Sequence, residues 1–176
     1  MHAGGFPAMH APTPATGVMN PPDRWGRRTR MGVENFHEVG PVGSLLVGVR
    51  YSTHLFIGRP KVSSMQPLYR RATGGSEAEG RRYGDVASPE TVVIARPGYA
   101  VGAIRTRAGL ALDGCVLVFM RIRGDQLDPS DAYDSPVIGD SQGGSPGYSF
   151  GGGRPAVGIE GRARQNVESV GLVLDR

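Results

Sequence analysis

The sequence is poor in the residues from which many catalytic and metal centres are built. It has 4 histidines and 1 cysteine in 176 residues, and aromatic residues make up only 7%. One cysteine excludes a disulfide within the chain, and a cysteine-based metal site would need further ligands. Because Cys115 opens the apolar run 115–119, we expect it to be a small buried hydrophobic residue.

Histidine is missing after position 54, which removes most routes to catalysis from the rest of the chain. Neither a Ser-His-Asp triad, nor a Cys-His pair, nor a histidine-rich metal site can be assembled there. The glycines at 151–153 lack the strand, helix and lysine of a phosphate-binding loop. We therefore expect no enzyme, no cofactor and no metal.

The acids Asp125, Asp128, Asp131 and Asp134 recur at every third position. This spacing does not fit the calcium loop of an EF-hand, and we expect a solvated, turn-forming loop instead. Hydrolysis by paired carboxylates stays open, because these acids and Asp113 could approach each other in the fold.

The net charge of +4 does not form the kind of basic surface that binds nucleic acid. Much of the excess lies between Arg24 and Arg30, and the later arginines are interleaved with acids. No basic stripe with aromatic residues is present, so we expect no nucleic-acid partner. No apolar stretch is long enough to cross a membrane and no secretory pattern is visible, which leaves a cytoplasmic location as the default expectation.

Glycine and proline are abundant, with 28 and 14 copies, and they divide the chain into two regions. In residues 1–41 they punctuate alanine, methionine and histidine without a helical or strand period, which predicts a disordered N-terminal tail. From residue 42 onward, short apolar runs alternate with turn residues, which predicts an all-β domain at 42–176. The expected strands are 45–49, 62–69, 91–95, 99–104, 112–120, 155–159 and 167–174, with two polar loops at 70–90 and 121–148.

An internal repeat is the strongest signal in the domain. Residues 100–119 align with residues 156–174 after one residue is removed, so that Ile104 matches Ile159 and Asp113 matches Glu168. A fainter copy runs from 46 to 69 with a longer loop. Each copy is a pair of strands that cannot bury its apolar face alone. Three copies around a common axis would share one core.

The C-terminal copy resembles a known family, the jacalin-related lectins. GSPGYSF at 144–150 and VGIEGR at 157–162 are similar to the family's Gly-Thr-x-Phe and Val-Gly-Phe-x-Gly-Arg. The usual Gly-Pro-Trp-Gly-Gly opening is reduced to Gly-Pro-Val-Gly at 40–43. The resemblance covers about 43–174 and implies a jacalin-like β-prism, which is three Greek-key sheets with pseudo-threefold symmetry, behind the disordered tail.

The resemblance also implies a sugar site, because the family holds sugar between a Gly-x-x-x-Asp loop and a facing glycine-rich loop. An ionised aspartate accepts hydrogen bonds from sugar hydroxyls, nearby amides donate hydrogen bonds in return, and glycine lets the ring approach the main chain. The middle copy has this pattern, and Gly-Gly follows at the place of the facing loop. The implied carbohydrate-binding residues are Gly109, Leu110, Ala111, Leu112, Asp113, Gly143 and Gly144, with the amides of 109–112 as donors.

The other two copies depart from the sugar-binding pattern. In the C-terminal copy, Arg164 would crowd the approach and Glu168 would move the carboxylate, while the first copy has Ser63 in place of the acid. We therefore expect one sugar site out of three. Tyr148 or Tyr133 could supply a stacking ring to it.

Two functions remain open at the level of sequence. The first is a carbohydrate-binding module without catalysis, whose glycan is mannose- or galactose-like. The second is a protein-interaction or structural module that keeps the prism but has lost sugar binding, which the two degraded copies favour. Members of the family often form dimers through exposed strands, so a homodimer is left open.

Overall fold

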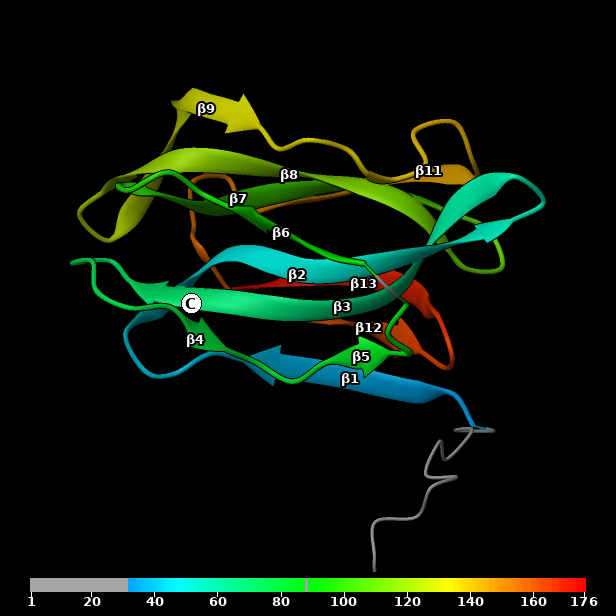
Figure 1. Ribbon diagram of the computed structural model, residues 1–176. Helices are drawn as coiled ribbons and strands as arrows, with labels where there is room; N and C mark the ends of the chain where they lie inside the picture. The colour runs from blue at the N-terminus through cyan, green and yellow to red at the C-terminus, as the bar shows by residue number, and fades with distance from the viewer. Residues whose placement is uncertain (1–31, 88) are drawn as a thin grey trace, which may run out of the picture.

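The computed structural model describes residues 32–87 and 89–176, and in these residues it contains thirteen strands and no helix (Figure 1). Accordingly, the described part of the chain has no helix that could cross a membrane. The strands are β1 (Glu34–Val39), β2 (Ser44–Phe56), β3 (Arg59–Arg71), β4 (Ala78–Glu79), β5 (Tyr83–Gly84), β6 (Glu90–Ile94), β7 (Tyr99–Ala108), β8 (Leu112–Arg123), β9 (Gln126–Asp134), β10 (Ile138–Gly139), β11 (Ser145–Phe150), β12 (Ala156–Ala163) and β13 (Val167–Leu174).

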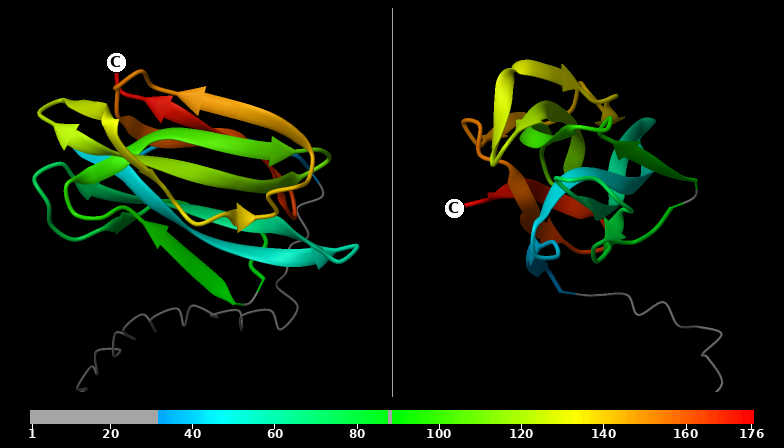
Figure 2. Two further views of the ribbon diagram at one scale, coloured as in Figure 1. Left: turned by 90° about the horizontal axis from the view of Figure 1, so that it is seen from above. Right: turned by 90° about the vertical axis from the view of Figure 1, so that its left-hand side faces the viewer.

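Each copy of the sequence repeat forms one antiparallel hairpin, and each hairpin is the centre of its own sheet. The sheet around β2–β3 has β6 on one side and β4 and β5 on the other, and the sheet around β7–β8 has β11 on one side and β9 and β10 on the other. The third sheet has the order β1-β12-β13. The right-hand view of Figure 2 shows the sheets around a common interior. The predicted all-β prism of three sheets is confirmed.

Matching β-bulges show that the three hairpins are equivalent residue by residue. In each hairpin the second strand skips one residue shortly after the turn, and these residues are Ser63, Asp113 and Glu168. They are the same three positions that the sequence alignment brings together. A bulge puts two residues opposite one and bends the strand, so it is a strong positional marker.

The core is shared between the hairpins, as the repeat predicts. Ile104 and Ile159 occupy equivalent, fully buried positions, two residues after a skipped residue of the first strand. Val62, Leu112 and Val167 precede the bulges of the second strands and are also fully buried. Each such side chain contributes about 1.5–3 kcal/mol when it is removed from water.

The domain begins earlier than predicted, because residues 34–39 of the expected tail form strand β1. This strand pairs with β12, and Phe36 is only 6% exposed and stacks on Tyr83 with ring centroids 4.0 Å apart. Glu38 accepts hydrogen bonds from the Tyr83 hydroxyl at 2.7 Å and the Arg81 amide at 3.0 Å. Burial, reinforced by Glu38, raises the pKa of Tyr83 to about 12. Residues 1–31 of the predicted tail lie outside the described residues.

The two predicted polar loops are also partly wrong, because they contain strands. The segment 121–148 includes β9, β10 and the first part of β11, and the segment 70–90 includes β4 and β5. The acidic segment forms β9, and its carboxylates form ion pairs with arginines of neighbouring strands. Asp131 accepts hydrogen bonds from the Tyr99 hydroxyl at 2.8 Å and from Arg121 at 2.6 Å, and these contacts lower the pKa of its carboxyl. Side-chain pairing thus favours strand structure where apolar alternation is missing.

The early start of the domain predicts that Phe36 contributes to stability. Phe36→Ala should lower the free energy of unfolding by about 3–5 kcal/mol, because it removes a buried ring and leaves a cavity beside Tyr83. His37→Ala is the matched control, since this neighbour is exposed and its ring bonds to the exposed Glu160 of β12. Urea denaturation followed by circular dichroism measures both changes. Equal, small losses would show that β1 is not part of the cooperative domain.

Candidate functional site

The turn between β7 and β8 carries the predicted Gly-x-x-x-Asp residues. The Gly109 amide donates to the Ala111 carbonyl at 3.0 Å, so it is already used within the turn. This corrects the expectation that Gly109 is a free amide donor. Leu110 is fully exposed at the tip, and the Leu112 side chain is fully buried in the core. Within the described residues, the amides of Leu110 and Ala111 make no backbone hydrogen bond in this turn.

Gly143 and Gly144 lie directly against Asp113, where the resemblance to jacalin-related lectins implies a facing loop. A Cβ atom on Gly143 would come within 2.7 Å of Asp113 Cγ. A Cβ on Gly144 would come within 2.5 Å of the Ala108 carbonyl carbon and closer still to Asp113 Oδ2. Gly144 also has a φ of 58°, which favours glycine. The fold therefore brings the two predicted loops together around one carboxylate.

The Asp113 side chain is only 2% exposed, and Lys61 on β3 forms an ion pair with its Oδ1 atom. The other oxygen, Oδ2, faces the glycine loops, at 3.7 Å from the position of a Cβ on Gly109. One oxygen is thus held by a cation from the neighbouring sheet, and the other is turned toward the predicted site.

The equivalent residues of the other copies are satisfied within their own hairpins. Glu168 pairs with Arg164 at 3.0 Å and with Arg162 at 3.5 Å. The Ser63 hydroxyl is hydrogen-bonded to Ser52 at 2.9 Å. The carboxylate and the hydroxyl that would face a ligand therefore already have partners. The loss of sugar binding in these copies stays a prediction.

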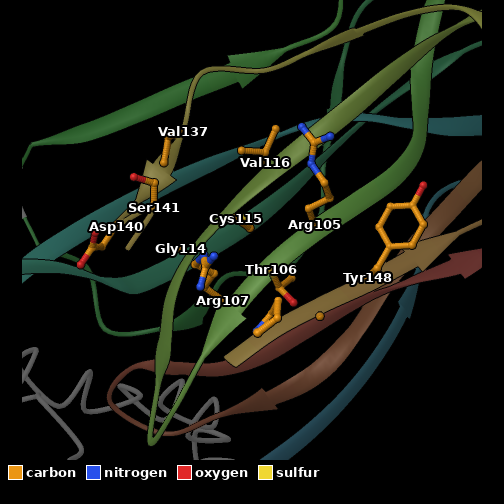
Figure 3. A pocket seen from close by; sticks show the side chains of 12 residues that line it. Arg105, Thr106, Arg107, Gly114, Cys115, Val116, Val137, Asp140, Ser141 and Tyr148 are labelled. Atoms are coloured by element: carbon orange, nitrogen blue, oxygen red, sulfur yellow. The ribbon is translucent and has the colours of Figure 1, made fainter. Parts of the chain in front are cut away.

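A groove lies on the outer face of the sheet built around β7–β8 (Figure 3). Its volume is about 500 Å³, and β7, β8, β11 and the segments around β10 line it. Tyr148 is 64% exposed and stands on one side, while Val137 and Ser141 stand on the other. Sequence reasoning singled out Tyr148 but not this groove, because its lining residues come from separate strands.

Other residues singled out in the sequence have structural surroundings. Tyr133 packs against Tyr99 and Phe119, and Arg96 lies 4.2 Å from the centre of its ring, so Tyr133 supplies no free ring. Cys115 is buried, and this burial raises the pKa of its thiol to about 12, as suits an unreactive hydrophobic residue. Residues 32–87 and 89–176 hold no cluster of three or more His, Cys, Asp or Glu side chains that could bind a metal.

Known structures with the same fold are found for this chain. A prostate-specific glycoprotein lectin has a TM-score of 0.59 at 17% identity, over 81% of this chain and 91% of that chain. A mannose-binding jacalin-related lectin from Ananas comosus has a TM-score of 0.54 at 14% identity, over 82% and 94%. A galactose-binding lectin from Champedak has a TM-score of 0.52 at 13% identity, over 74% and 92%. The chain therefore has the jacalin-like fold.

Sequence comparisons alone do not reach this result. No protein-family model matches the chain. No curated protein matches it either. The fold is thus shared with these lectins at sequence identities of 17% or less in the three structures above.

The close approach of the glycine loop predicts that Gly144 tolerates no side chain. Gly144→Ala should cost about 1–3 kcal/mol more than a change that only strains the backbone, because the new Cβ overlaps Asp113 and Ala108. Gly152→Ala is the matched control, since Gly152 has a similar φ of 64° and nothing lies within 4 Å of a Cβ there. Thermal unfolding of both variants measures the difference. Equal losses would mean that the loop does not press against Asp113.

Proposed function

We propose that the chain is a carbohydrate-binding module without catalysis, whose site lies between the 109–113 turn and the Gly143–Gly144 loop. The observation that supports it most is the convergence of both loops on Oδ2 of Asp113. The fold adds support, since the solved structures that share it include a mannose-binding and a galactose-binding lectin.

The chemistry of the site suits a neutral sugar hydroxyl. Oδ2 of Asp113 accepts a hydrogen bond from a hydroxyl that enters between the loops, and the amides of Leu110 and Ala111 donate hydrogen bonds to the sugar oxygens. Lys61 stays paired with Oδ1, so that Oδ2 is the oxygen left to face the ligand. Gly109 leaves the space that a close approach of a ring to the main chain needs, since a Cβ there would meet only Asp113 Oδ2, at 3.7 Å. Gly144 instead lets its own loop lie against Asp113.

The proposal predicts that sugar binding depends on Asp113 and not on its equivalent in the third sheet. The full-length chain on a broad glycan array should retain at least one mannose- or galactose-containing glycan, and Asp113→Asn should lose this retention. Asparagine preserves the shape of the side chain, so circular dichroism should stay unchanged. Glu168→Gln is the matched control and should bind like the wild type, since Glu168 is paired within its own hairpin. A wild type that retains no glycan would overturn the proposal.

A second candidate function follows from the ion pair between Lys61 and Asp113. Because Lys61 comes from β3 and Asp113 from β8, the pair links two sheets, and the carboxylate is almost fully buried. This suits a structural or protein-interaction module in which Asp113 holds the fold together and no sugar binds. The two functions make different demands on Lys61.

A double-mutant cycle distinguishes the structural role. Lys61→Met should lower the free energy of unfolding by about 3 kcal/mol, at the lower end of the range for a broken buried pair, because Lys61 is 20% exposed. Lys61→Met combined with Asp113→Asn should recover part of this loss, since no unpaired charge is left. Strong coupling together with no glycan on the array would favour the structural module. Additive effects would exclude a structural role for the pair.

A further inference from the structure

We infer that the outer-face groove is a second binding site, which takes a saccharide unit bearing a carboxylate, such as a uronic acid. Its side chains belong to β7, β11 and the segments around β10, whereas Asp113 faces the glycine loops. The two sites therefore use different groups, and either can fail without the other. The inference rests on the shape of the groove, on its one uncompensated cation and on its exposed ring.

Strand pairing builds the groove from the main chain outward. Across β7 and β11, Arg105 is opposite Tyr148 and Arg107 is opposite Pro146. Since side chains alternate between faces, these residues share the outer face of the sheet. Gly114, opposite Arg107 on β8, lets the β10 segment lie directly against β8, because a Cβ there would meet the Ile138 carbonyl oxygen at 2.6 Å.

Charge pairing leaves one cation of the groove free. Arg105 is paired with Asp134, and Asp140 is paired with Arg59 at 3.2 Å. Arg107 has no carboxylate partner within residues 32–87 and 89–176, and its one hydrogen bond is a long one of 3.4 Å to the Gly144 carbonyl. A half-buried guanidinium with most of its donors unused is a strong site for a carboxylate, which it binds through two parallel hydrogen bonds.

The rest of the groove suits a ring that is apolar on its face and polar at its edge. Tyr148 presents an exposed ring, and Val137 adds apolar surface across the groove (Figure 3). The hydroxyl of Ser141 and the carboxylate of Asp140 stand on the same side as Val137. Diagonal neighbours such as Tyr148 and Arg107 lie about 7–8 Å apart in an antiparallel pair. This separation matches one pyranose ring with its exocyclic carboxylate.

The equivalent arginine of the third sheet provides a contrast. Arg162 aligns with Arg107, but it is paired with Glu168 at 3.5 Å. The opposite partner of Glu160, at the position equivalent to Arg105, is His37 rather than an exposed aromatic ring like Tyr148. An uncompensated arginine beside an exposed ring is therefore found on the sheet around β7–β8 and not at the equivalent place on the third sheet.

Calorimetry with two oligosaccharides of equal size tests the inference on the full-length chain. Trigalacturonate should bind at least about tenfold more tightly than galactotriose, since only the former carries carboxylates for Arg107. Arg107→Gln should remove this preference, and Tyr148→Ala should weaken binding of trigalacturonate while leaving the fold unchanged by circular dichroism. Equal affinity for the two sugars in the wild type would overturn the inference.

Two control variants separate binding in this groove from general electrostatic attraction and from binding at Asp113. Arg162→Gln removes an aligned arginine from another sheet and should leave trigalacturonate binding unchanged. If it weakens binding as much as Arg107→Gln does, the attraction is general electrostatics and the inference is wrong. Asp113→Asn should also leave trigalacturonate binding unchanged, so that a failure of the Asp113 site is seen separately on the glycan array. A loss of trigalacturonate binding in Asp113→Asn would place the ligand at the glycine loops and overturn the second site.

Discussion

A two-stranded hairpin has an apolar face that it cannot bury by itself, and the rest of this structure depends on how that problem is solved. Three hairpins turn their apolar faces toward one interior, so that Ile104 of one is buried in the same way as Ile159 of another. The hydrophobic effect acts on all three together because none has a separate core. The outer strands then pair with the edges of hairpins whose positions are fixed by this shared core.

The bulge on the second strand of each hairpin decides where chemistry can occur. It follows a buried residue and precedes the continuation of the strand, so the skipped residue stands at the end of the shared core. The fold thus offers three equivalent positions, and local residues give each a different character. Asp113 forms an ion pair with a lysine of another sheet, and Glu168 forms ion pairs with arginines of its own hairpin. Ser63 is hydrogen-bonded to a serine hydroxyl.

The resemblance to jacalin-related lectins implies that the two glycine loops face each other, whereas the repeat in the sequence predicts the hairpins and the core, because these follow from apolar spacing and from alignment of the copies. It does not predict β1, β9 or β11. Their segments are polar, and contacts with residues far away in the chain, such as Glu38 with Tyr83, accompany them. The pairing of Lys61 with Asp113 is equally invisible, because it crosses between two sheets and no spacing links the two residues.

The regions that the apolar pattern leaves undetermined are also those that carry the differences between the sheets. The shared interior constrains the hairpins to be alike, whereas the outer strands are free to vary. Beside β7–β8, Tyr148 stands on one side and the Val137–Ser141 segment stands on the other, and a groove lies between them. In the described residues of the third sheet, β13 has no outer strand, so one wall of such a groove is missing there. Ligand recognition on this fold is therefore expected to follow the outer strands and the bulge partners rather than the core.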